Sequence, residues 1–66
     1  MTTAAKALTG VAHCLLHYRY LGRVRPSSRD IERAISDCAP LVGADRGECL
    51  DAEYELRRRY GLASAH

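Results

Sequence analysis

Apolar residues recur at helical spacing in three separate segments of this chain. A helix places residues three and four positions apart on one face, so each segment predicts an amphipathic helix with one buried stripe. The segments span approximately residues 3–21, 28–39 and 46–60, and three such helices predict a compact all-α domain. The expected buried stripes are, in chain order, Leu8, Val11, Ala12, Leu15 and Leu16; Ile31, Ala34, Ile35 and Cys38; Cys49, Ala52, Leu56 and Tyr60.

Cap and turn residues mark the ends of the predicted helices. Ser27, with Asp30 three positions on, is typical of a helix start, and Asp45 with Glu48 repeats that spacing. Glycine favours the left-handed conformation that closes a helix, and proline lacks the amide hydrogen that an interior position donates. The helices are therefore expected to end at Gly22, Pro40 and Gly61, in that order.

The third helix carries a second apolar stripe, formed by Leu50, Tyr54 and Gly61, about 100° round from the first. One stripe is enough to close a three-helix core. The second stripe either widens the buried face, which is the simpler interpretation, or meets another chain, for which tyrosine is well suited. A chain of 66 residues buries only about 60% of the surface that its unfolded form exposes, so dimerisation through the third helix would add stability.

Length and composition bound the class of protein. The 66 residues predict a single domain, 1–66, with a frayed tail at 62–66. Hydrophobic residues make up 47% of the chain, which excludes an acidic disordered tail. No apolar run has the length of a membrane span, and the first residues lack the apolar core of a signal peptide. We therefore expect a cytoplasmic protein whose three cysteines are reduced.

Charged residues are sorted along the chain. Residues 1–29 carry five bases and no acid, residues 30–55 carry all eight acids and two bases, and three arginines follow at 57–59. Glu53 with Arg57 and Glu55 with Arg59 stand four positions apart on the third helix and are predicted to form ion pairs. The protein is therefore expected to present two electrostatic faces, although its formal net charge is only +2. The basic segment 19–29 holds four arginines and Tyr20, and His17 and Tyr18 precede it, so that arginines and tyrosines together suit a binding edge that takes phosphates or carboxylates.

Candidate catalytic and metal-binding residues are sparse. His13 and His17 stand four positions apart, which is the spacing of half a zinc site, but two surface histidines explain the same residues. Asp51 and Glu55 share a face in the same way and are expected to be solvated. The cysteines on the apolar stripes are expected to be buried thiols rather than a disulfide. Without a phosphate-binding glycine loop or an activated nucleophile, the sequence predicts no enzyme and no cofactor.

One segment resembles a known family. Pro26 to Ile31, continuing through Ala34 and Ile35, is similar to the helix that opens the helix-turn-helix of SOS-type repressors. The resemblance implies a DNA-binding domain in which a tight turn and a recognition helix follow. The next helix here departs from that pattern, because its first residues, 45–51, are rich in carboxylates.

Two classes of function therefore remain open. The preferred interpretation is a small non-enzymatic regulatory or inhibitory protein that binds a larger protein partner, a kind common among phages and mobile elements. The alternative is a helix-turn-helix-like protein that binds nucleic acid through residues 19–29. We expect no membrane partner, and a homodimer is compatible with both interpretations. The predicted partner-binding residues are Arg19, Tyr20, Arg23, Arg25, Arg29, Tyr54, Glu55 and Arg58.

Overall fold

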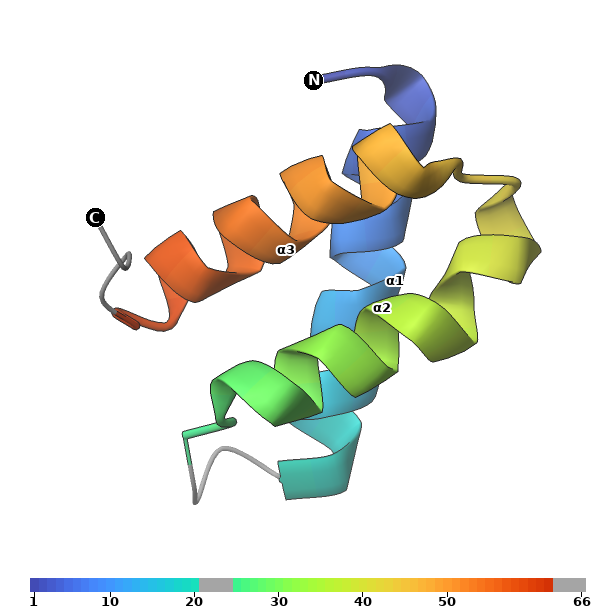
Figure 1. The fold of residues 1–66 in the computed structure, drawn as a ribbon. Helices are drawn as coiled ribbons and strands as arrows, with labels where there is room; N and C mark the ends of the chain where they lie inside the picture. The colour runs from blue at the N-terminus through green and yellow to red at the C-terminus, as the bar shows by residue number, and fades with distance from the viewer. Residues whose placement is uncertain (21–24, 63–66) are drawn as a thin grey trace.

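Three helices in two layers make up the fold. The computed structural model describes residues 1–20 and 25–62, and within these ranges it holds α1 (Thr3–Tyr20), α2 (Ser28–Val42) and α3 (Arg46–Arg59) and no strand. Helices α2 and α3 form a V that is joined at residues 43–45, and α1 crosses behind both of them (Figure 1). The molecule is therefore flat, 29 × 29 × 16 Å along its principal axes. The predicted all-α three-helix architecture is confirmed.

The core lies where α1 crosses the V. The face of α1 that is buried there is rotated from the predicted one: Val11 is 37% exposed, and Ala5 and Thr9 are buried instead. The Thr9 hydroxyl donates a hydrogen bond to the carbonyl of Ala5 (2.8 Å), which satisfies its polar group. The prediction for Val11 is wrong because α1 must meet two helices at once, and periodicity alone does not fix that rotation. The buried core cluster is Leu8, Ala12, Leu16, Ile31, Ala34, Ile35, Cys38, Ala52 and Leu56.

Both predicted helix starts are capping boxes. The Ser27 backbone N–H donates to the Asp30 carboxylate (2.8 Å), and the Asp30 N–H donates to the Ser27 hydroxyl (3.2 Å). Asp45 and Glu48 exchange the same two hydrogen bonds, at 2.9 and 2.8 Å. Each box satisfies backbone donors that the first turn of a helix leaves unpaired, so short helices of 15 and 14 residues begin at defined positions.

Helix α2 does not stop at Pro40 but continues to Val42. Pro40 lies in the last turn, where its missing amide hydrogen removes a single bond at the helix end. Gly43 then ends the helix with a left-handed φ of 65°, and the N–H groups of Gly43 and Ala44 both donate to the carbonyl of Ala39. The expectation that proline stops the helix is therefore wrong by three residues, because the glycine cap satisfies the end of the helix.

Helix α3 ends at Gly61, as the sequence predicted. Gly61 has a left-handed φ of 69°. Its N–H donates to the carbonyl of Arg58 (3.2 Å), and the N–H of Leu62 donates to the carbonyl of Arg57 (2.9 Å), which is the pair of bonds of a Schellman motif. Leu62, the first residue of the predicted tail, is partly buried against the core. The rest of that tail, and the predicted helix end at Gly22, lie outside the described residues.

Candidate functional site: the outer face of helix α3

The second apolar stripe of α3 lies on the surface. The side chains of Leu50 and Tyr54 are 54% and 57% exposed, whereas Ala52 and Leu56 on the first stripe are buried. The simpler interpretation, in which the second stripe widens the core, is wrong because α1 covers only one side of α3. We call Leu50 and Tyr54 the α3 stripe. Sequence reasoning placed Tyr54 among the binding residues and omitted Leu50, although the four-residue spacing between them is the signal that joins them.

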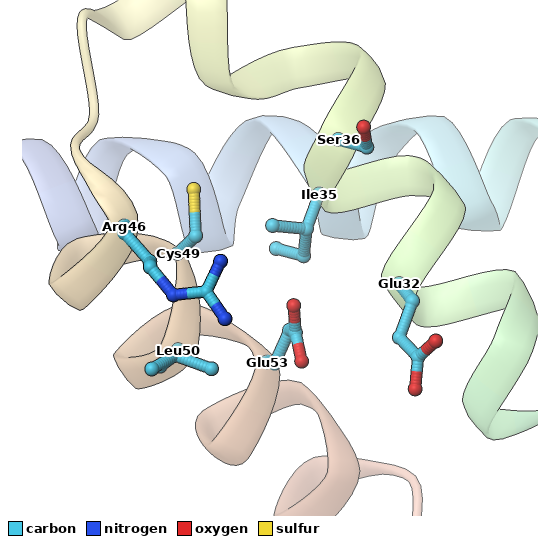
Figure 2. Close-up of a pocket in the computed structure, with 7 residues that line it drawn as sticks. All are labelled: Glu32, Ile35, Ser36, Arg46, Cys49, Leu50 and Glu53. Carbon is cyan, nitrogen blue, oxygen red and sulfur yellow. The ribbon is translucent and has the colours of Figure 1, made fainter.

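A groove runs between α2 and α3 beside this stripe. Its volume is about 460 Å³, and the buried side chain of Ile35 and the partly buried thiol of Cys49 supply its apolar lining. Figure 2 shows the guanidinium of Arg46 reaching past Cys49 toward the carboxylate of Glu53. The groove can accommodate an apolar side chain with polar groups around it, as protein-binding grooves do. Its full lining is Glu32, Ile35, Ser36, Arg46, Cys49, Leu50 and Glu53.

Arg57 bridges the two arms of the V at the end of this groove. Its guanidinium donates to the Ser28 hydroxyl (2.8 Å) and to the carboxylates of Glu32 (2.9 Å) and Glu53 (3.4 Å). The pair with Glu53 is the helical ion pair that the sequence predicted, and it is confirmed. The bonds to α2 connect positions 25 and 29 residues apart and hold the open side of the V at a fixed width.

Arg58 and Glu55 are paired with each other. Glu55 accepts hydrogen bonds from Arg58 and from Arg59 (3.2 Å), and these bonds, those of Arg58 first, lower the pKa of its carboxyl. The predicted pair of Glu55 with Arg59 is thus confirmed. Glu55 is therefore engaged within the molecule, whereas Arg58 remains mostly exposed. A small hollow of about 90 Å³ lies next to the α3 stripe and is lined by Tyr54, Arg57, Arg58 and Leu62.

The arginines of the predicted basic edge lie in different environments. Arg19 forms an ion pair with Asp37 (3.3 Å), while Arg25 and Arg29 are exposed. A guanidinium nitrogen of Arg25 lies beside the end of α3, 3.8 Å from where a Cβ on Gly61 would stand. This position suits the negative end of the helix dipole. Arg23 lies outside the described residues.

Tyr20 is half-buried and interacts with the cap of α2. Hydrogen bonding of its phenol to Asp30 raises the pKa of Tyr20. The pKa of the Asp30 carboxyl is lowered, mainly by the backbone hydrogen bond from Ser27 and then by the side-chain bonds from Tyr20 and Ser27. Tyr20 is therefore packed partly against the core, so it is less available to a partner than the sequence suggested.

The hydrogen bonds that the Asp30 carboxylate accepts at the start of α2 predict that the protein is less stable at acidic pH. Because the folded pKa of Asp30 lies below the unfolded value of 3.8, its carboxylate stabilises the fold above that value, and the contribution is lost as the pH falls through the folded pKa. Asp30→Asn keeps an acceptor for the Ser27 amide but cannot titrate. We expect its melting temperature to fall less than that of the wild type between pH 6 and about pH 2. Equal falls, measured by circular dichroism in the same buffers, would contradict the assignment.

His13 is tied to α3 rather than free at the surface. Its Nδ1 atom lies 3.0 Å from the hydroxyl of Tyr60, and the two rings stack with centroids 5.7 Å apart. His17 stacks in turn on His13 at 6.5 Å. In residues 1–20 and 25–62 no group of three metal-ligating side chains comes together. The contact with Tyr60 therefore accounts for His13 as a link between helices, and burial raises the pKa of that tyrosine.

The three cysteines are free, and they lie in different environments. Cys14 is exposed, Cys38 is buried and Cys49 is partly buried. Burial raises the pKa of the thiols of Cys38 and Cys49, which keeps both of them protonated and unreactive. The predicted buried thiols are confirmed for Cys38, and Cys49 instead lines the groove.

Compared with family models, with curated proteins and with solved structures, this chain gives no match. Among the described residues, no helix has the length and apolar character needed to cross a membrane. The function must therefore be inferred from the surface that the three helices present.

Proposed function

We propose that this chain is a small non-enzymatic regulatory or inhibitory protein that binds a larger protein partner through the α3 stripe and the adjoining groove. The observation that carries the proposal is the exposure of Leu50 and Tyr54 by more than half beside a groove that has both apolar and charged side chains in its lining. Tyrosine combines a large apolar area with a polar tip, and such residues supply much of the binding energy in protein interfaces. Cytoplasmic localisation belongs to the same proposal.

The charges around the stripe suggest the chemistry of the partner. Arg46, Leu50, Tyr54 and Arg58 follow one another at intervals of four residues along α3, so an arginine stands at each end of the apolar pair. The guanidinium of Arg25 adds a further positive charge beside Gly61, at the end of the helix. A matching partner segment carries apolar side chains in its centre and carboxylates toward both ends.

A capture experiment tests this proposal. The tagged protein is incubated with lysate of its source organism, with and without nuclease, and the retained partner is purified for titration. We expect Tyr54→Ala to weaken its binding about 30-fold, as for a central interface tyrosine. Leu41→Ala is the matched control, because Leu41 is 74% exposed on α2 and lies outside the groove. Equal affinity for both variants would remove the α3 stripe from the proposal.

A second candidate function is nucleic-acid binding. Only residues 43–45, with Gly43, separate α2 from α3, and helix-turn-helix motifs use turns of about this length. In that role α3 would be the recognition helix, although its exposed face also carries Asp51. Nuclease treatment distinguishes the two candidates, because a nucleic-acid-binding domain would retain nucleic acid and lose its protein partners after digestion.

A further inference from the structure

His13 and His17 lie on one face of α1, about one turn apart, with their rings close together. The ring centroids are 6.5 Å apart, and the ring planes differ by 25°. His17 is exposed and His13 is partly exposed, so an ion can reach both side chains from solvent. Two imidazoles at a four-residue spacing on a helix form a pair of ligands that one metal ion can bind at the same time.

The contact with Tyr60 orients one of these two ligands. The Nδ1 atom of His13 lies 3.0 Å from the Tyr60 hydroxyl, while the other ring nitrogen, Nε2, makes no hydrogen bond with the described residues. Histidines that bind metals commonly hold their second nitrogen in such a bond, which fixes the tautomer and the orientation of the ring. His13 therefore has the arrangement of a ligand that binds through Nε2 and donates the Nδ1 hydrogen to the Tyr60 oxygen.

The available ligands determine the class of ion. Helix α1 contains no aspartate or glutamate, and Cys14 lies about 100° round the helix from His13. Among the residues that the structure describes, no third ligand joins the two histidines. Imidazole nitrogens suit zinc, nickel and copper, whereas magnesium and calcium prefer oxygen ligands. The pair is therefore suited to a divalent transition-metal ion.

We infer that His13 and His17 bind one divalent transition-metal ion, such as Zn²⁺ or Ni²⁺, and that Tyr60 positions His13 for it. Zinc holds histidine nitrogens at about 2.0–2.1 Å, so the two imidazoles must converge on the ion. The exposed side chain of His17 turns toward His13 for this, while the contact with Tyr60 keeps His13 in place. Water fills the remaining positions around the ion.

Binding of the ion would strengthen the junction of α1 with α3. With the ion at Nε2, the proton stays on Nδ1, and its bond to Tyr60 joins positions 47 residues apart. The four-residue spacing brings the imidazoles together only in a helix, so the ion binds the folded protein more tightly and raises its melting temperature. The inference goes beyond the proposed function and does not depend on it, because it uses no residue of the α3 stripe or the groove.

Calorimetric titration of the protein without an affinity tag tests the site, with Zn²⁺ and Ni²⁺ as probes and Mg²⁺ as the control ion. We expect one equivalent of Zn²⁺ or Ni²⁺ to bind, and no Mg²⁺. Tyr60→Phe keeps an aromatic ring and removes the hydroxyl, and we expect it to weaken binding about 10-fold or more. His17→Gln removes a ligand and is expected to weaken binding further. Cys14→Ser, at an exposed thiol of the same helix, is the matched control and is expected to bind like the wild type.

Nuclear magnetic resonance of the ¹⁵N-labelled, zinc-bound protein shows which nitrogen of His13 holds the ion. We expect zinc at Nε2 and a proton on Nδ1. Zinc at Nδ1, or a Tyr60→Phe variant with wild-type affinity, would overturn the role of Tyr60.

Three outcomes would overturn the site itself. They are no binding at zinc concentrations up to about 1 mM, wild-type affinity in His17→Gln, and loss of binding in Cys14→Ser. Circular dichroism before each titration confirms that the helices of the variant are intact. His17 is exposed, so its replacement keeps the test valid even where Tyr60→Phe is unfolded.

Discussion

Leu56→Ala is expected to lower the free energy of unfolding by about 2–5 kcal/mol. Leu56 is 0% exposed and lies in the core cluster, with Leu8 and Leu16 from α1 and Ile31 and Ile35 from α2. Truncation removes its apolar contacts and leaves a cavity, because the surrounding side chains relax only partly. A domain of this size has only a few kcal/mol of stability, so a substantial fraction of the variant should be unfolded at 37 °C.

The matched control lies six residues earlier on the same helix. Leu50→Ala makes the same chemical change at a side chain that is 54% exposed, and we expect it to alter stability by no more than about 0.5 kcal/mol. Urea denaturation followed by circular dichroism measures both variants. A loss of similar size in both would mean that Leu50 is part of the core and would also remove it from the proposed binding surface.

The features that the sequence predicted correctly are those decided within a few residues. Both capping boxes depend on side chains three positions apart, and Gly61 adopts the left-handed conformation that few other residues accept. The ion pairs of Glu53 and Glu55 with arginines four positions later have the same local origin. These interactions form inside a single helix, so its sequence contains all that is needed to predict them.

The predictions that failed depend on how the helices meet. The exposure of Val11 follows from the angle at which α1 crosses α2 and α3, and that angle is set by packing at several points together. Pro40 was expected to stop α2, but the cap at Gly43 satisfies the carbonyl of Ala39 and the helix continues. In both cases an interaction elsewhere in the fold overrides a local preference.

The candidate site was predicted only in part, for the same reason. Tyr54 and Arg58 were placed on a binding face because their spacing along α3 is visible in the sequence. The groove next to them has lining residues from α2 and α3, and the contact between His13 and Tyr60 joins positions 47 residues apart. Periodicity does not show which faces of two helices are adjacent. It therefore identified the second stripe of α3, but neither its exposure nor the groove beside it.

Removal of the Arg57 bridge between α2 and α3 is the second change that we expect to have a large effect on stability. Arg57→Ala is expected to lower the free energy of unfolding by about 1–2 kcal/mol, because it removes the bonds to Ser28, Glu32 and Glu53 and the packing of the arginine stem. The guanidinium lies at the end of the groove with its side chain only 27% exposed, so water replaces these bonds incompletely. Glu53, itself mostly buried, is left without its cation.

Arg58→Ala is the control for Arg57→Ala, because it also removes a positive charge from α3 but leaves the bonds to α2 in place. Its side chain is mostly exposed and its pair with Glu55 lies within α3, so the expected loss is less than about 1 kcal/mol. Urea denaturation at low and high salt compares the two variants. The effect of Arg57→Ala should shrink in high salt but remain the larger, because salt screens the ion pairs and leaves the bond to Ser28 and the packing in place. If the two losses are equal at both salt concentrations, the open side of the V is not held by Arg57, and the width of the groove is set by the core alone.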